Sequence, residues 1–248
     1  MQNRYVGDVG DFAKLTLLRT LTRETNFRLA VIWYLFADET HNGDGRHVSY
    51  LRDLRLAEAD PDLHSALSRI VSNGKREVRS IARARVLPST TSFFTLPISD
   101  PKTARMTRIE RETLRATWLR KALASALDHE LVFLDPDNGL ETASVLRHSP
   151  KSGKYVFWNE LEQFWTQGHS LIVYHHLNRT MTVARQTEIL RAKFSERFSA
   201  SPLRMHFLAR RGSCRHFWVI GQEQHAGALE RAITAIDQSP LREYLIAG

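Results

Sequence analysis

The sequence contains little cysteine and no long apolar run, and each absence excludes a class of protein. The single cysteine, Cys214, excludes an internal disulfide and a metal site built from several cysteines. No apolar stretch approaches the roughly 20 residues of a membrane-spanning helix, and no secretory signal precedes the first charged residues. Repeats and low-complexity linkers are also absent. We therefore expect a cytoplasmic protein with no membrane partner, and the sequence dictates no oligomeric state.

Negative charge is in the minority, since 27 Asp and Glu face 35 Lys and Arg, which gives a net charge of +8. The excess is mostly arginine, clustered within residues 75–85, 102–121 and 204–215. Guanidinium groups suit phosphate, so these clusters predict contact with a nucleic acid, either RNA or DNA. The alternative is a basic surface without a partner, because Glu110 and Glu112 interleave the second cluster as they would on a solvated helix face.

Strand patterns that alternate with helical ones predict an α/β fold. With 42% apolar residues in a chain of 248, one substantial core can form. Apolar or β-branched runs predict strands at residues 29–36, 91–96, 131–134 and 170–174, and helical periodicity appears at 8–22, 103–127, 159–167, 181–198 and 223–236. Two further strands, 204–209 and 216–221, flank Gly212-Ser213 and predict a hairpin.

This order of elements predicts a single α/β domain over residues 1–248. We expect a doubly wound, mostly parallel sheet of Rossmann-like methyltransferase topology that ends in an antiparallel hairpin. Residues 62–85 read as helical and polar, and they predict a small helical insertion at about residues 57–86. The topology alone does not determine the function, which depends on the residues of the site.

The most informative segment is Leu131-Val-Phe-Leu-Asp-Pro-Asp-Asn-Gly-Leu-Glu141, in which a buried strand stops at a polar turn. Pro136 cannot extend the strand, and the residues after it favour a turn. Open α/β sheets bind their ligands at the carboxyl ends of such strands. The segment therefore predicts a functional site that contains Asp135, Asp137, Asn138 and Glu141. The alternative is an ordinary acidic turn.

Two other strand ends carry polar groups that would share the same edge of the sheet. The first is the loop after residue 36, with Asp38, Asn42, Asp44 and Gly45. The second is Tyr174-His-His-Leu-Asn-Arg179, in which we favour His176 over its neighbour because it lies nearer the loop. The Asn-Gly and Asp-Gly pairs also form turns without any ligand.

The amino-terminal segment Asn3-Arg-Tyr-Val-Gly-Asp-Val-Gly-Asp-Phe-Ala-Lys14 places glycines and aspartates before a helix. Backbone N–H groups at a helix start can face an anion or a base, and Lys14 lies one turn further on. The alternative is that Asp8 or Asp11 only caps the helix.

These groups allow two chemistries. In the first, the loop at residues 42–45 holds a nucleoside cofactor, and the turn at residues 135–138 orients an amine for methyl transfer. In the second, carboxylates bind Mg²⁺ or Mn²⁺ for phosphoryl transfer or hydrolysis, and the ligands would be Asp38, Asp135, Asp137 and Glu141.

The segments quoted above, together with Asp44-Gly-Arg-His47, resemble a family of uncharacterised bacterial proteins. A more distant resemblance is to the adenine-N6 methyltransferases of large-subunit ribosomal RNA. Those enzymes have Ala-Asp-Val-Leu-Lys-His near their start, similar to Gly10-Asp-Phe-Ala-Lys14, and an Asp-Pro-Pro-Tyr turn that corresponds to residues 135–138. Here Asp-Asn replaces Pro-Tyr, so the aromatic residue that stacks on the base is missing. The glycine-rich loop after the first strand is also replaced.

Together, the residues and the resemblance lead us to expect a nucleic-acid-directed enzyme, an S-adenosylmethionine-dependent methyltransferase that acts on a base amine. The expected catalytic residues are Asp135, Asp137, Asn138 and His176. The expected cofactor-binding residues are Asp38, Asn42, Asp44 and Gly45, and the expected substrate-binding residues are Lys14, Arg46, Glu141 and Arg179. The alternatives are a nuclease or phosphohydrolase that uses Mg²⁺ and an inactive basic nucleic-acid-binding module.

Overall fold

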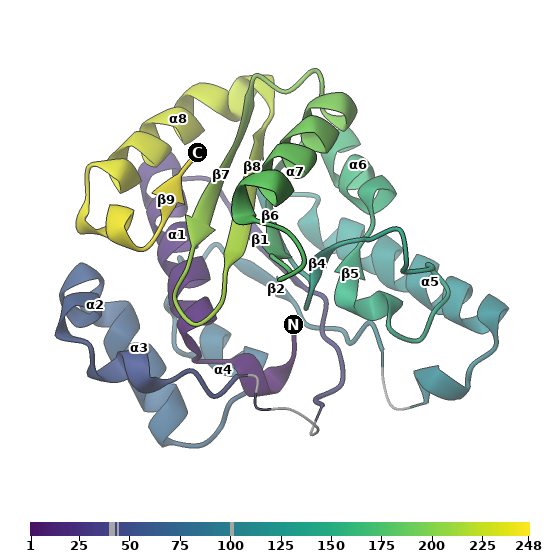
Figure 1. The fold of residues 1–248 in the computed structure, drawn as a ribbon, viewed down its shortest axis with the longest axis horizontal. Coiled ribbons are helices and arrows are strands. Elements are labelled where there is room, and N and C mark those ends of the chain that lie inside the picture. Colours follow the sequence, from purple (N-terminus) through teal and green to yellow (C-terminus); the bar gives the residue numbers. More distant parts are fainter. Residues whose placement is uncertain (40–42, 44, 100–101) are drawn as a thin grey trace.

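The computed structural model describes residues 1–39, 43, 45–99 and 102–248. A seven-stranded sheet lies at the centre, in the order β2-β1-β3-β6-β8-β7-β9 (Figure 1). The strands are β1 (Leu29–Trp33), β2 (Ser92–Phe94), β3 (Leu131–Asp135), β6 (Ser170–His176), β7 (Leu203–Ala209), β8 (Arg215–Gly221) and β9 (Ile246–Ala247). Strands β2, β1, β3 and β6 are parallel, whereas β8 is antiparallel to β6 and β7. The predicted Rossmann-like sheet with a terminal antiparallel hairpin is therefore confirmed.

Helices cover both faces of the sheet, which explains why every residue of β1 and β3 is buried. Helices α1 (Val9–Thr25) and α8 (Glu223–Asp237) pack on one face, and α5 (Arg108–Ala126), α6 (Trp158–Thr166) and α7 (Val183–Arg197) pack on the other. Neighbouring residues of a strand point to opposite faces. The row Val31, Phe133 and Ile172 accordingly joins the core under α1. The row Ala30, Val132 and Leu171 joins the core under α5 and α6.

The segment between β1 and β2 forms a group of short helices beside α1 (Figure 1). They are a 3-10 helix at Ser49–Arg52, α2 (Leu54–Ala59), α3 (Pro61–Ser72) and α4 (Val78–Arg83). The helical pattern at residues 62–85 is thus divided in two, and Gly74 has a φ of 67° just after α3. Leu63 and Leu67 of α3 belong to the same core as α1, so the group packs onto the main domain. In the described part of the chain, no helix is long and apolar enough for a membrane span.

A second, two-stranded sheet follows β3, and one of its strands lies in residues 155–158, which the sequence predicts as a brief extended piece. It pairs β4 (Gly139–Leu140) with β5 (Tyr155–Val156) in parallel. Gly139 adopts a φ of 105°, and a Cβ there would lie 2.5 Å from Nδ1 of His175. Two residues are too few for a periodic pattern, so the sequence does not predict β4. This pairing turns the chain away from the sheet edge directly after Asn138.

Candidate functional site

A cavity of about 230 Å³ lies at the carboxyl ends of β3 and β6, beside the first turn of α1. It is the position at which an open α/β sheet binds its ligands. Most of the predicted site residues line it: Lys14, Gly45, Asp135, Asp137, Asn138, His176 and Arg179. The structure thus brings together four chain segments that are far apart in the sequence. We refer to this cavity as the edge pocket.

The structure places three other predicted site residues outside the lining of the edge pocket. Glu141 lies beyond β4, and its Oε1 accepts a hydrogen bond of 2.8 Å from the backbone N–H of Trp158. Asp38 accepts a hydrogen bond of 3.2 Å from the backbone N–H of Arg4. Arg46 is exposed and lies between two residues that line the pocket. The expectation that Glu141 gathers with Asp135 was wrong, because β4 carries the chain toward α6. Asn42 and Asp44 lie outside the described residues.

Lys14 and Asp135 form the buried centre of the edge pocket. The Nζ atom of Lys14 lies 2.7 Å from Oδ2 of Asp135 and 3.0 Å from Oδ1 of Asp11. Burial opposes the charged form of Lys14, but the two carboxylates outweigh it and raise the pKa of this ammonium above its ordinary value. Burial raises the pKa of both Asp11 and Asp135, which share that one ammonium. The positive charge of Lys14 is therefore fixed, and it presents Asp135 at the end of β3.

Asp137 and Asn138 are held by the segment before β5. Oδ2 of Asp137 accepts a hydrogen bond of 2.8 Å from Nε2 of Gln2 and lies 3.3 Å from Nζ of Lys154. The backbone N–H of Asn138 donates to the carbonyl of Lys154 at 2.8 Å. These contacts fix the turn after Asp135, and both residues still line the edge pocket.

The two adjacent histidines of β6 have different surroundings. His175 is turned toward β4, where its Nδ1 accepts a hydrogen bond of 3.1 Å from the backbone N–H of Leu140. Burial lowers the pKa of His175 to about 4. His176 is exposed at the edge pocket, and its Nδ1 lies 3.4 Å from the hydroxyl of Tyr174. The structure thus places His176, the histidine favoured from the sequence, at the pocket.

The crevice between β1 and β3 is filled by the first residues of the chain. Met1 and Gln2 are only 2% and 0% exposed. The backbone N–H of Phe36 donates to the carbonyl of Met1 at 2.8 Å, and the amino group of Met1 donates to the carbonyl of Tyr34 at 3.0 Å. A nucleoside cofactor would bind in this crevice in a sheet of this type. With Met1 and Gln2 in place, the residues at this edge do not fit S-adenosylmethionine.

The carboxylates proposed as metal ligands have other partners. Asp135 pairs with Lys14, Asp137 with Gln2 and Lys154, and Asp38 and Glu141 each accept a backbone N–H. Within residues 1–39, 43, 45–99 and 102–248, no group of His, Cys, Asp and Glu is arranged to hold a metal ion. The arrangement therefore does not fit Mg²⁺, whose sites use carboxylates that are open to the ion.

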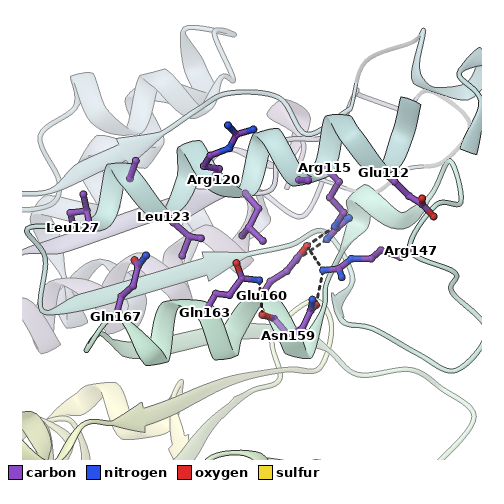
Figure 2. Close-up of a pocket in the computed structure, with 13 residues that line it drawn as sticks. Glu112, Arg115, Arg120, Leu123, Leu127, Arg147, Asn159, Glu160, Gln163 and Gln167 are labelled. Carbon is purple, nitrogen blue, oxygen red and sulfur yellow. Dashed lines mark hydrogen bonds and ion pairs between the residues drawn. The ribbon is translucent and has the colours of Figure 1, made fainter. Parts of the chain in front are cut away.

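A larger cavity of about 630 Å³ lies between α5 and α6, and none of the predicted site residues lines it (Figure 2). Its buried charges satisfy one another, since Nε of Arg115 lies 2.6 Å from Oε1 of Glu160. Nη2 of Arg147 donates to Oδ1 of Asn159 at 2.6 Å. Leu123 and Leu127 form part of its apolar wall (Figure 2). The edge pocket, in which Nε and Nη1 of Arg215 have no hydrogen-bond partner in the described part of the chain, is the better candidate for a functional site.

Several residues that line the edge pocket are not among the site residues predicted from the sequence, including Tyr5, Tyr174, Ser213 and Arg215. Arg215 was assigned to a basic cluster, because its pattern is that of any arginine at a strand start. The hairpin motif around Gly212-Ser213 could have indicated that this turn reaches the sheet edge. Tyr174 lies on the strand that ends in the two histidines, and its ring supplies an aromatic surface at the pocket.

Comparisons with known proteins gave no match: no family model matches the chain, and no curated protein matches its sequence. The resemblance to ribosomal RNA methyltransferases therefore stays a prediction.

Proposed function

We propose that this protein is a nucleic-acid-directed enzyme whose edge pocket receives one nucleotide of an RNA or DNA strand. The observation that carries the proposal is a set of exposed arginines on three loops around the pocket. Arg179 lines the pocket, Arg46 lies between pocket residues Gly45 and His47, and Arg210 is on the loop that contains Gly212. These arginines form no ion pair with any residue that the structure describes, so they can neutralise phosphates of a bound strand.

Inside the pocket, the residues suit a nucleotide. Tyr174 offers a ring for stacking, and Asp135 and Asn138 offer oxygen and amide groups to the polar edge of a base. His176 is the one exposed histidine at the end of β6, and an imidazole can transfer a proton near neutral pH. We assign proton transfer to His176, and positioning and electrostatic stabilisation to Asp135 and Lys14.

Methyl transfer to a base amine is the second candidate reaction, because the strand order favours it. Four parallel strands followed by the antiparallel hairpin of β7 and β8 agree with the methyltransferase topology expected from the sequence. Because Met1 and Gln2 fill the crevice, this reaction requires the amino-terminal segment to leave it. Calorimetric titration of the full chain with S-adenosylmethionine tests methyl transfer. Binding of the cofactor would support it, and no binding would leave the acid–base chemistry assigned to His176.

Arg46, Arg179 and Arg210, the exposed arginines around the edge pocket, are called the rim arginines, and their removal tests the nucleic-acid proposal. We expect Arg179→Met and Arg210→Met each to weaken binding several-fold and to reduce the slope of log affinity against log salt concentration by about 0.7 to 0.9. Fluorescence anisotropy with labelled RNA and DNA oligonucleotides, measured over a series of salt concentrations, gives both quantities. The control is Arg231→Met on α8, an exposed arginine far from the pocket lining, which should bind as wild type does. An affinity that does not depend on salt concentration would contradict the proposal. So would an equal loss of affinity in Arg231→Met.

Replacement of His176 tests the enzymatic part. We expect His176→Gln to slow the conversion of RNA or DNA about 100-fold, because it removes the proton-transferring group. Mass spectrometry of the nucleic acid after incubation with the protein detects cleavage and base modification alike. The control is His148→Gln, a histidine outside the edge pocket, which should react at the wild-type rate. If the folded protein binds the nucleic acid but never changes it chemically, the proposal of an enzyme is refuted. The protein would then be a nucleic-acid-binding module.

A further inference from the structure

Arg215 is a buried arginine whose charge has no counterion. Arg215 is the first residue of β8 and is 5% exposed. Nη2 donates to the hydroxyl of Ser213, whereas Nε and Nη1 have no hydrogen-bond partner in the described chain. No carboxylate of the described residues lies within ion-pair distance of it. Buried polar groups are almost always satisfied, so such a guanidinium requires an explanation.

Arg115 shows how this protein otherwise buries an arginine. It is also 5% exposed, and it donates to both carboxylate oxygens of Glu160 at 2.6 and 2.9 Å. Its remaining donors reach the carbonyls of Ser152 at 2.9 Å and Tyr155 at 2.8 Å. Each guanidinium nitrogen of Arg115 therefore has a partner within the protein. Nε and Nη1 of Arg215 have none, and Arg215 lines the edge pocket.

The surroundings of Arg215 combine a helix amino terminus with the carboxylate of Asp8, another residue of the pocket lining. The guanidinium lies against the first turn of α1, where a Cβ at Gly10 would be 3.0 Å from Nη1. This helix is 17 residues long, and its amino-terminal end carries a partial positive charge. Lys14 lines the same pocket, but its ammonium is occupied by two carboxylates. Asp8 also lines it, and its Oδ1 accepts the backbone N–H of Asp11 at 3.1 Å as the helix cap.

We propose that Arg215, Ser213 and the first turn of α1 form a binding site for a phosphate group. The unpartnered Nε and Nη1 groups of Arg215 can donate hydrogen bonds to phosphate oxygens, and the helix end favours a negative charge. A cavity of about 230 Å³ has room for a phosphate together with a small attached group. The ligand class is a phosphate ester, such as a nucleotide or a strand end. Only the identity of the attached group rests on the proposed function.

Inorganic phosphate tests the site directly. We expect phosphate to raise the unfolding temperature of the full chain above that in chloride at equal ionic strength, since it binds the folded state. Arg215→Met should abolish this rise, and calorimetry should show phosphate affinity at least about tenfold weaker. Ser213→Ala, which keeps the guanidinium, should weaken the affinity less. Arg231→Met should respond to phosphate as wild type does.

Two results would overturn the site: an unchanged phosphate response in folded Arg215→Met, or no response of the wild-type protein beyond that to chloride. If Arg215→Met does not fold, the Ser213→Ala variant decides, because equal affinity in it and in wild type would also refute the site. The outcome is separate from the proposed function. Loss of oligonucleotide binding in Arg179→Met and Arg210→Met tests only the role of the rim arginines in the proposed function. The effect of phosphate on the unfolding temperature of the same variants tests only the phosphate site at Arg215.

Discussion

Lys14→Met should destabilise the fold by about 3–5 kcal/mol, the usual loss when one partner of a buried ion pair is removed. Lys14 is 4% exposed and holds the carboxylates of Asp135 and Asp11 at 2.7 and 3.0 Å. Methionine fills a similar volume, and the rings of Trp33 and Tyr174 lie 5.4 and 5.7 Å from Nζ. The loss should therefore come from charge rather than from packing. Urea unfolding at pH 7 measures it.

A double variant separates charge from shape in this prediction. Lys14→Met combined with Asp135→Asn removes one of the two unpaired carboxylates, and we expect it to recover part of the lost stability. The control is Lys121→Met, an exposed lysine on α5, which should change the free energy of unfolding by less than about 0.5 kcal/mol. A Lys14→Met protein as stable as wild type would refute the view that the Lys14 charge is needed at the sheet edge.

The pH dependence of Lys14→Met gives a second test. Without the ammonium, burial and mutual repulsion raise the pKa of Asp135 and Asp11 further, so these carboxyls become neutral as the pH falls. A group with a raised folded-state pKa stabilises the fold at low pH. The difference in stability between wild type and Lys14→Met should therefore shrink from pH 7 to pH 5. A difference that stays constant would mean that the loss at pH 7 is one of packing.

The sequence predicted the sheet because its central strands have a local cause. Residues 131–134 form an uninterrupted apolar run that stops at Pro136, and the structure ends β3 at Asp135. The ion pair of Lys14 with Asp135 could not be predicted in this way, because 121 residues separate the partners. The sequence places Lys14 one turn into a helix and predicts a substrate-binding role for it, not a buried ion pair. Only the packing of α1 on the sheet brings its ammonium beneath the end of β3.

The difference between local sequence patterns and contacts made only on folding also explains which parts of the site were predicted. Asn138 lies in the turn after β3, and His176 is the last residue of β6, so strand positions alone predict that both lie at the edge pocket. Glu141 follows the same strand as Asn138, but two residues of β4 pair with β5 and redirect the chain. Arg215 gave no signal, since its lack of a counterion is a property of the folded surroundings and not of its neighbours in the sequence. Unpaired buried groups of this kind become visible only in three dimensions.

Two buried histidines should make the fold sensitive to acid. His206 on β7 and His216 on β8 are 5% and 0% exposed, and their ring centroids are 4.5 Å apart. Burial and the neighbouring His206 lower the pKa of His216 to about 3. Burial and Arg191 of α7 lower the pKa of His206 to about 4, against a weaker effect of its backbone hydrogen bond to Gly248. Thr187 is the polar group of α7 that faces His216, with its hydroxyl 3.3 Å from Nε2.

The sign of the effect follows from which state binds more protons. Below pH 6.5 the unfolded chain protonates both histidines, whereas the folded protein keeps them neutral down to about pH 4 and 3. Stability should therefore fall as the pH decreases through this window. At 1.36 kcal/mol per pH unit, each histidine contributes a loss of about 2 kcal/mol between pH 7 and pH 5, or about 4 kcal/mol for the pair. The raised pKa values of Asp11 and Asp135 act in the opposite direction, so variants must isolate the histidines.

The double variant His206→Gln with His216→Gln isolates this effect. Whatever it loses in stability at pH 7, its stability should change less between pH 7 and pH 5 than that of wild type, by about 4 kcal/mol. Urea unfolding at several pH values measures the slope rather than the absolute stability. The control is His47→Gln, an exposed histidine at the edge pocket, which removes an imidazole but should keep the wild-type slope. Equal slopes in wild type and the double variant would mean that these histidines take up protons inside the fold, and that the cluster at β7 and β8 is open to water.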